Sequence, residues 1–431
     1  MVRWRRCIES SMAERWRALG ALGALIALGL AMLAADQHAA RAADSTTPPL
    51  SASLGGVGTG VVAGKPSASR LSLGSDAWQR TGYGAIRGVT IGPIESALHP
   101  NKGYSSPAYE RTLGEVARLG GNWVSLTPFA RVWDLHGTGL SLSFEAPFGE
   151  TRAAIVRAVR QAHARGLRVL VVPHLWVESG AWRGELDPGT DEAWREWARN
   201  YRAFLLTWAE VAREAHADML SVGVELRSWL TTAHAPSFAP ILADTRRAFP
   251  GLLTYAGNWD DIAQTVILGD LDVIGLNAFF PLAEQDGAGF DELAAGGRRV
   301  RAQLKALADS WQKPILFNEF GYTTRANTAI RPWEWPDKMS HVQPDQAAQA
   351  DGYRALLSAF VDEPWFAGFF VWRLYADPDD MSQEAEWGFS PRGKAAELVL
   401  RDAFTARWAG DGALELGGAL WRTQAHDVGR F

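Results

Sequence analysis

The chain contains a single cysteine, Cys7, among its 431 residues. Cys7 precedes an apolar run near the start of the chain, so a domain that follows this run has neither a disulfide nor a thiolate ligand for a metal. Its stability must therefore come from a buried core. The hydrophobic share of 47% is that of an ordinary globular protein, and the length suits one elaborated barrel, which needs roughly 250 residues or more.

Runs of basic residues are also missing. Acidic residues number 48 against 43 Lys and Arg, and such a balance argues against nucleic acid as a partner. The chain shows no internal repeat of the kind that builds solenoids. No Gly-x-Gly-x-x-Gly motif follows its first apolar strand pattern, which disfavours a dinucleotide-binding fold.

Residues 1–42 are predicted to be an export signal. Five arginines precede an uncharged run over residues 18–35, and Ala40-Arg41-Ala42 offers a cleavage site between small residues. We therefore expect a periplasmic or extracellular protein, although the apolar run is also long enough to remain as an inner-membrane anchor. Residues 43–80, rich in Ser, Gly, Ala and Thr, are expected to form a flexible lead-in. The domain is expected over residues 81–410, with 411–431 as a tail without assigned role.

Short apolar runs alternate with helical patterns over the predicted domain, and the runs number eight. The predicted strands are Ile86–Gly92, Asn122–Pro128, Arg168–Trp176, Met219–Leu226, Leu252–Trp259, Val273–Phe279, Pro314–Gly321 and Ala367–Arg373. The predicted helices are Pro107–Leu119, Thr151–Arg165, Thr190–His216, Pro240–Phe249, Leu293–Trp311, Gln343–Phe360 and Gly393–Trp408. The segment after Trp259 has the weakest helical pattern. This alternation permits an open doubly wound sheet or a closed barrel, and eight units favour a single (β/α)8 barrel.

Two of the predicted strands end in a glutamate. Glu225 follows Val222-Gly223-Val224, and Glu319 follows Phe317-Asn318. A carboxylate at the end of an apolar strand is costly without a partner or a task, and catalytic groups of such barrels lie at the C-terminal ends of strands. Glycoside hydrolysis uses two carboxyl groups, one to protonate the leaving oxygen and one to attack the anomeric carbon or activate water. The alternative for either glutamate is a buried ion pair with Arg227 or Arg373.

Other residues near predicted strand ends suit sugar binding, because amides offer hydrogen bonds to hydroxyl groups and indoles stack on sugar rings. Twenty tryptophans are a large supply of such platforms, although many are also expected to pack between helices and barrel. The candidate substrate-binding residues are His174, Trp176, Asn258, Trp259, Asn277, Tyr322 and Trp372. Trp333 and Trp335 are further candidates for the wall of a sugar subsite. Each of these residues has a purely structural alternative in barrel packing or loop capping.

Four stretches carry a resemblance to a known family. They are Val172–Val177, Val222–Leu226, Asp272–Leu282 and Phe317–Tyr322. In this order they resemble glycoside hydrolase family 113, β-1,4-mannanases within the clan of retaining (β/α)8-barrel glycosidases, over about residues 84–408. The resemblance implies that Glu225 is the acid/base and Glu319 the nucleophile. It also implies β-mannan or a related β-glycan as substrate and no cofactor.

The chain departs from the clan at two positions. Many clan members have an asparagine before the acid/base, where this chain has Val224. The clan often has a tyrosine near the end of the sixth strand that bonds the nucleophile, where this chain has Phe279 and Phe280. Either Tyr255 or Tyr322 would have to supply that hydroxyl, or the bond is missing.

Three other functions remain open from sequence alone. A non-catalytic carbohydrate-binding barrel would keep the tryptophans without needing both glutamates. A metal-dependent hydrolase is disfavoured, because among nine histidines no His-x-His occurs and only His174 lies near a strand end. Transglycosylation would use the same intermediate as hydrolysis. We expect no metal, no nucleic acid partner, no membrane contact beyond a possible N-terminal anchor, and a monomer.

Overall fold

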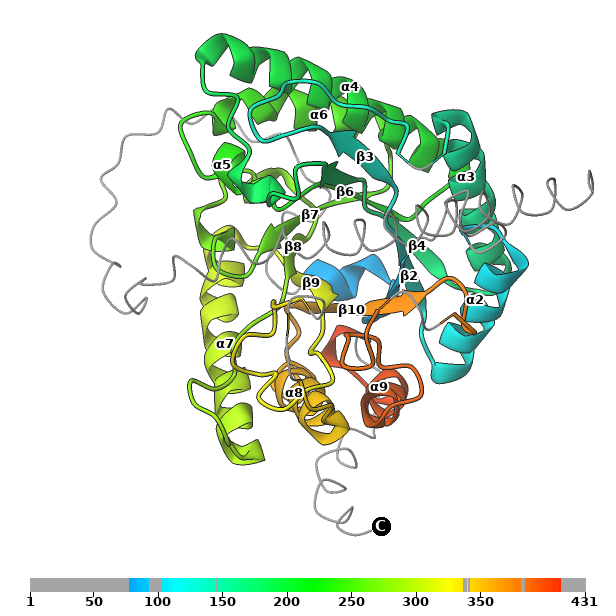
Figure 1. Cartoon of the computed structure of the whole chain (residues 1–431), viewed down its shortest axis with the longest axis vertical. Helices are drawn as coiled ribbons and strands as arrows, with labels where there is room; N and C mark the ends of the chain where they lie inside the picture. The colour runs from blue at the N-terminus through cyan, green and yellow to red at the C-terminus, as the bar shows by residue number, and fades with distance from the viewer. Residues whose placement is uncertain are drawn as a thin grey trace, which may run out of the picture.

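The computed structural model describes residues 77–92, 103–144, 146–335, 339, 342–380 and 384–411. Eight parallel strands close into a barrel in the order β1-β10-β9-β8-β7-β6-β4-β2, with helices around it (Figure 1). The predicted (β/α)8 barrel is thereby confirmed. The predicted export signal, residues 43–76 of the lead-in and the tail beyond Asp411 lie outside the described residues.

The bounds of the elements follow the predicted runs closely. The barrel strands are β1 (Ile86–Gly92), β2 (Trp123–Leu126), β4 (Arg168–Val171), β6 (Met219–Val224), β7 (Leu252–Asn258), β8 (Ile274–Asn277), β9 (Ile315–Phe320) and β10 (Phe366–Tyr375). The helices are α2 (Pro107–Leu119), α3 (Phe148–Ala164), α4 (Asp191–Ala215), α5 (Arg227–Leu230), α6 (Ala239–Ala248), α7 (Phe290–Trp311), α8 (Gln346–Ser358) and α9 (Ala395–Thr405). None of these helices is both long and apolar enough to cross a bilayer.

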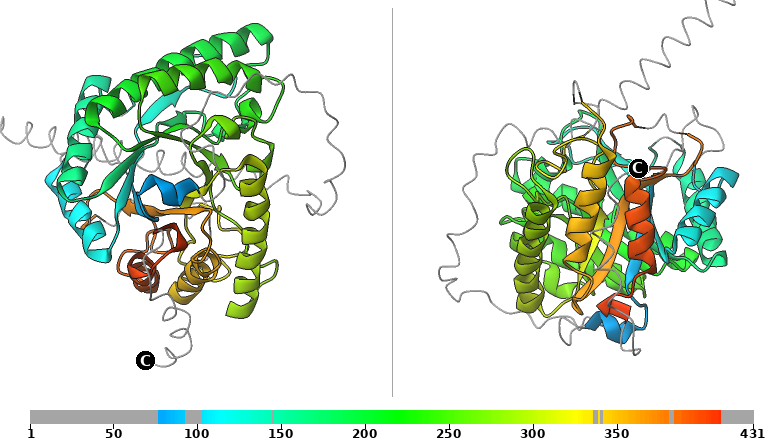
Figure 2. Two further views of the ribbon diagram at one scale, coloured as in Figure 1. Left: turned by 180° about the vertical axis from the view of Figure 1, so that it is seen from behind. Right: turned by 90° about the horizontal axis from the view of Figure 1, so that it is seen from below.

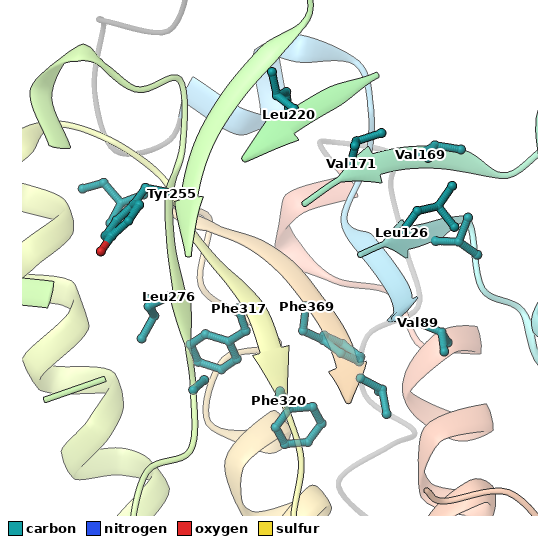
Figure 3. Close-up of a cluster of buried hydrophobic side chains, with 14 of the residues drawn as sticks. Val89, Leu126, Val169, Val171, Leu220, Tyr255, Leu276, Phe317, Phe320 and Phe369 are labelled. Carbon is teal, nitrogen blue, oxygen red and sulfur yellow. The ribbon is translucent and has the colours of Figure 1, made fainter. Parts of the chain in front are cut away.

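Local sequence explains where several helices begin and how they pack. The side chains of Ser106, Thr190 and Asp345 accept hydrogen bonds from the first turns of α2, α4 and α8, which satisfies amides that no helical carbonyl reaches. The apolar stripe of each helix packs on the outward-facing side chains of the strands. Figure 3 shows part of this layer, including Phe317 and Phe369.

Two predicted strands differ from those of the structure. The run predicted as Asn122–Pro128 contains β2, and β3 (Phe129–Val132) follows it directly. The run predicted as Arg168–Trp176 divides into β4 and β5 (His174–Val177) around Pro173. Proline lacks the N–H that a ladder needs, so the barrel strand stops there. β3 and β5 pair with each other as a separate two-stranded sheet, which periodicity alone did not reveal.

The connection between β7 and β8 is the least regular part of the shell. It contains only two 3-10 turns, Ile262–Gln264 and Leu268–Asp270, in agreement with the weak helical pattern after Trp259. Asp272 begins the next strand run with its carboxylate buried, accepting hydrogen bonds from the Leu253 amide and from Arg246. The hydrogen bonds of the Asp272 carboxylate therefore hold this connection at a place where other connections have a helix.

Residues just before the predicted domain boundary at residue 81 pack on the barrel. Ala77–Thr81 forms a 3-10 helix, and Trp78 is completely buried against Tyr83 at the N-terminal end of the barrel. The Trp78 indole donates to the Gly84 carbonyl over 2.7 Å. In the right view of Figure 2, this turn lies beside the last turn that the structure describes, Ala409–Asp411, at the end opposite the strand arrowheads. The two ends of the domain thus close the bottom of the barrel together.

Candidate active site

Glu225 lies immediately after β6 and is 1% exposed. Its backbone adopts the left-handed conformation, with φ of 52°, and its amide donates to the Ala256 carbonyl over 2.8 Å. Its Oε2 accepts a hydrogen bond of 2.8 Å from the Trp182 indole and lies 3.4 Å from the Arg183 guanidinium. Its Oε1 accepts a hydrogen bond of 3.2 Å from the Asn277 amide. The predicted acid/base is thus buried and held from both sides.

Glu319 belongs to the same site, because Asn277 links the two glutamates. Asn277 pairs in register with Glu319 across β8 and β9, while its side chain bonds Glu225. Asn258 pairs with Asn277 on the other side, so that Asn258, Asn277 and Glu319 form one row across three strands. The His174 Nε2 lies 3.7 Å from Glu319 Oε1. Two predicted catalytic residues and three predicted binding residues therefore meet at one end of the barrel.

The two carboxyl groups are electrostatically coupled. Burial, and after it the neighbouring Glu225, raise the pKa of Glu319 to about 8. Arg183 and Arg373 act in the opposite direction and lower this pKa. Two close acids in a poorly solvated site do not both ionise readily, so the pair retains one proton near neutral pH. The raised pKa of Glu319 places that proton on Glu319 in this structure. A bound glycoside must shift the proton if Glu225 is to act as the acid.

Aromatic side chains line the same end of the barrel. Phe279, Trp335, Trp372 and Phe389 form one cluster, and Trp259 stacks on Trp333 with ring centroids 5.4 Å apart. Within the described residues, the indole nitrogens of Trp259 and Trp333 make no hydrogen bond. Buried indole N–H groups without partners are uncommon. They are suitable donors to a sugar hydroxyl.

Trp372 connects this aromatic cluster to the catalytic pair. Its ring stacks on His174 with centroids 6.4 Å apart. It is joined by a cis peptide bond to Arg373, whose guanidinium lies over both the Trp372 and the Trp335 rings. The predicted aromatic floor under the catalytic residues is therefore next to both His174 and the arginine that acts on Glu319.

Tyr322 does not lie where a substrate-binding residue would. It is fully buried between β9 and α8, its ring packs against Gly352, and its hydroxyl donates to the Phe280 carbonyl over 3.2 Å. We therefore correct the prediction that it contacts substrate. Tyr255 accepts a hydrogen bond of 2.7 Å from the Leu226 amide. Since the hydrogen bonds of both hydroxyls go to the backbone, neither tyrosine supplies the clan's bond to the nucleophile in the described structure.

Trp176 lies on β5 beside Phe129 and Phe144, two residues beyond His174, and its role in substrate binding stays a prediction. The position of Arg227 differs from the ion pair considered from sequence. Arg227 pairs with Asp260 and Asp261, not with either catalytic glutamate. The buried ion pair weighed for Glu225 does exist, but its partner is Arg183.

Sequence reasoning missed three elements of the site. Trp182 and Arg183 reach Glu225 from the loop after β5, and no periodic pattern marks such a loop. Glu384, in the loop after β10, accepts a hydrogen bond of 2.9 Å from Tyr375, whose hydroxyl in turn accepts one from Arg373. The charged Arg373 at the end of the predicted strand Ala367–Arg373 was the only available signal for this network. In the part of the chain that the structure describes, no three His, Cys, Asp or Glu side chains gather as a metal-binding group.

Comparison with solved structures places this geometry among known barrels. The chain is similar to the family 113 β-mannanase AaManA from Alicyclobacillus acidocaldarius, solved in complex with ManMIm, with 24% identity, a TM-score of 0.63, and coverage of 74% of this chain and 97% of that one. A second family 113 β-1,4-mannanase shares 21% identity with a TM-score of 0.64 over 75% and 100% of the two chains. A family 5 mannosidase from Rhizomucor miehei shares 11% identity with a TM-score of 0.52 over 78% and 97%. No curated protein matches the chain significantly.

A family model covers most of the described domain. The model for Glycoside Hydrolase Family 113 matches residues 97–394, from before α2 to the start of α9. This span includes both glutamates and the loops that hold them. The chain is a glycosidase and belongs to glycoside hydrolase family 113.

Proposed function

We propose that this protein is an exported, retaining β-mannanase that cleaves β-1,4-mannan through a covalent glycosyl-enzyme intermediate. The observation that carries the proposal is the link from Glu225 through Asn277 to Glu319, which gives one site two buried carboxyl groups. Family membership and the similarity to mannanases with known structures support mannan as the substrate. The basic and apolar segments within residues 1–42 support export.

In the first step, the Glu319 carboxylate attacks the anomeric carbon while Glu225 donates its proton to the glycosidic oxygen. The carbon–oxygen bond to the leaving sugar breaks as the ester bond to Glu319 forms. Arg183 and Arg373 favour the ionised form of Glu319 that this attack requires. Substrate in the site must therefore move the shared proton to Glu225 before reaction.

In the second step, the Glu225 carboxylate takes a proton from water, and the oxygen of that water attacks the same carbon. The ester bond breaks and Glu319 leaves as a carboxylate, which regenerates the starting site with net retention. The Trp182 and Asn277 donors hold Glu225 in one orientation through both steps. A sugar hydroxyl in place of water would give transglycosylation from the same intermediate.

Two substitutions test the assignment of roles. We expect Glu225→Gln to lower kcat/KM on mannan by about 10²- to 10⁴-fold, since general acid catalysis contributes roughly that much. On a dinitrophenyl β-mannoside, whose leaving group needs no proton, this variant should keep a fast first step. Glu319→Ala should lose both activities. If Glu319→Ala kept a fast first step and Glu225→Gln lost it, Glu319 would be the acid/base and Glu225 the nucleophile.

Substrate and stereochemistry need a separate measurement. The purified enzyme, incubated with mannan, glucan, xylan and chitin oligosaccharides, should release products from mannan at the highest rate. Proton NMR of the first product should show the β-anomer, because two inversions restore the starting configuration. An α-anomer would contradict the retaining mechanism, and binding without turnover of any of the four would favour the carbohydrate-binding barrel.

A further inference from the structure

The small sheet formed by β3 and β5 has one buried face and one open face. Along β3, Ala130 and Val132 are buried, while Phe129 and Arg131 are partly exposed and Trp133, the next residue, is 58% exposed. Because side chains alternate along a strand, Phe129, Arg131 and Trp133 share the open face. Trp133 is one of the few large apolar side chains left exposed in the described structure.

The partner strand continues this face, which is buried at its inner end, where His174 is 1% exposed, and opens toward Trp133. His174 pairs with Phe129 and Trp176 with Arg131, and Glu178, two residues further along, forms an ion pair with Arg131. The face thus presents a ladder of side chains from two strands. It begins at His174, beside Glu319, and ends at Trp133.

Contacts between aromatic rings run along the inner part of this ladder, and the Arg131 guanidinium continues them to Trp133. The Phe129 ring lies 5.1 Å from His174 and 6.1 Å from Trp176. Phe144 covers both strands, with centroids 5.4 Å from Phe129 and 5.6 Å from Trp176. The Arg131 guanidinium then lies 5.2 Å from the Phe144 ring and 5.6 Å from the Trp133 ring.

Backbone hydrogen bonds make this sheet a rigid support. Arg131 exchanges two backbone hydrogen bonds with Ser141, of 2.8 and 2.9 Å, on the side away from β5. The Ser179 amide donates to the Trp133 carbonyl over 3.2 Å. An exposed indole on a fixed backbone loses little conformational entropy when a ligand stacks on it, which favours binding.

We propose that the open face of β3 and β5 is a remote sugar-binding surface that continues the active site, with Trp133 as its outer platform for a pyranose ring. The four-residue strand spans about 13 Å at ~3.3 Å per residue, which is more than one sugar unit from the catalytic pair. Only chains of several units reach Trp133. Arg131 and Glu178 flank the path with groups that hydrogen-bond sugar hydroxyls. The inference rests on the proposed function, because it assigns the glycan substrate to this surface.

The test compares long and short substrates. Wild type and Trp133→Ala are assayed on β-1,4-mannobiose, mannotriose, mannohexaose and soluble mannan. We expect Trp133→Ala to lower kcat/KM on mannan about tenfold, corresponding to the loss of ~1.4 kcal/mol of binding, and to leave the rate on the shortest cleaved oligosaccharide unchanged. Trp133→Phe should restore most of the loss, because it keeps a flat ring. Equal rates for Trp133→Ala and wild type on every chain length would overturn the proposal.

Leu398→Ala is the matched control. Leu398 is 54% exposed on α9, outside the barrel, and its truncation should change neither activity. Thermal unfolding of all variants separates lost binding from lost folding. If wild type cleaves none of the mannan substrates, the proposed function fails. The surface is then tested by affinity electrophoresis of wild type and Trp133→Ala in gels containing mannan, glucan or xylan, where equal mobility shifts in every gel would reject it.

Discussion

At the scale of single residues, the main property of the site is that its two buried carboxyl groups do not both ionise readily. Glu225 has donors on both oxygens, whereas the environment of Glu319 is dominated by burial and by the neighbouring acid. In the proposed mechanism the pair needs the proton that it retains, because one carboxyl gives a proton while the other attacks. Ionisation of the buried Glu319 carboxyl would also lower the stability of the fold, because burial disfavours the charged form.

The raised pKa of Glu319 predicts how stability depends on pH. The folded protein holds a proton on this group up to about pH 8, whereas the unfolded chain releases it near its ordinary value of 4.5. Stability should therefore fall as pH rises from about 4.5 to 8. Glu319→Gln removes this loss, so we expect the variant to unfold at a higher temperature than wild type at pH 8. Calorimetry at pH 5 and pH 8 should show the difference between the two proteins shrinking at the lower pH.

Arg373 provides a second prediction at this scale. The Tyr375 hydroxyl accepts a hydrogen bond of 2.9 Å from Arg373, and Arg373 lowers the pKa of Glu319. Tyr375→Phe should loosen Arg373, raise the pKa of Glu319 further and move the alkaline limb of the pH dependence of kcat/KM upward. Tyr353→Phe is the control, since the Tyr353 hydroxyl is also buried but has no hydrogen-bond partner among the described residues. An equal shift in both variants would contradict the role of Arg373.

At the scale of elements, α8 packs closely against the segment that follows β9, behind the site. Gly352 of α8 faces the Tyr322 ring, and a methyl group at this position would lie 2.8 Å from its Cγ. Glycine is normally the weaker choice inside a helix. Its presence here is explained by the ring, which packs where any side chain would have to go.

This packing yields a paired prediction about two helical glycines. Gly352→Ala should lower the free energy of unfolding by about 1–3 kcal/mol, the usual cost of overpacking a core. Gly149→Ala, in α3, should be neutral or stabilising by about 0.5 kcal/mol, since nothing lies within 4 Å of the added methyl group. Urea unfolding of both variants measures the two values. A stabilising Gly352→Ala would show that Tyr322 has room to move.

At the scale of the whole molecule, the two ends of the barrel have different tasks. The end with the strand C-termini holds the two glutamates, the β3–β5 sheet and the aromatic cluster with Trp259, Trp333, Trp335 and Trp372. The opposite end is closed by Ala77–Thr81 and by Asp411, which accepts hydrogen bonds from the Ala85 amide and from Arg87. This separation of stability from catalysis is general for such barrels.

Trp78→Ala tests that separation. Trp78 is completely buried at the closed end, and truncating a buried tryptophan typically costs about 3–5 kcal/mol. We expect the variant to unfold at a correspondingly lower urea concentration, while kcat/KM at 25 °C stays close to that of wild type. A large fall in kcat/KM of the folded variant would mean that the two ends are coupled.

The sequence by itself determined the barrel, because alternation of apolar runs and helical patterns depends only on local periodicity and leaves little choice of architecture. It also singled out Glu225 and Glu319 as the candidate catalytic pair, since a glutamate ending an apolar strand is conspicuous without any structure. Only the tertiary structure decided that Trp182, Arg183 and Asn277 hold Glu225, that Tyr322 faces α8, and that β3 and β5 leave the barrel as a separate sheet. These facts depend on loops and on contacts between residues far apart in the chain, and a local pattern carries no information about which distant side chains meet.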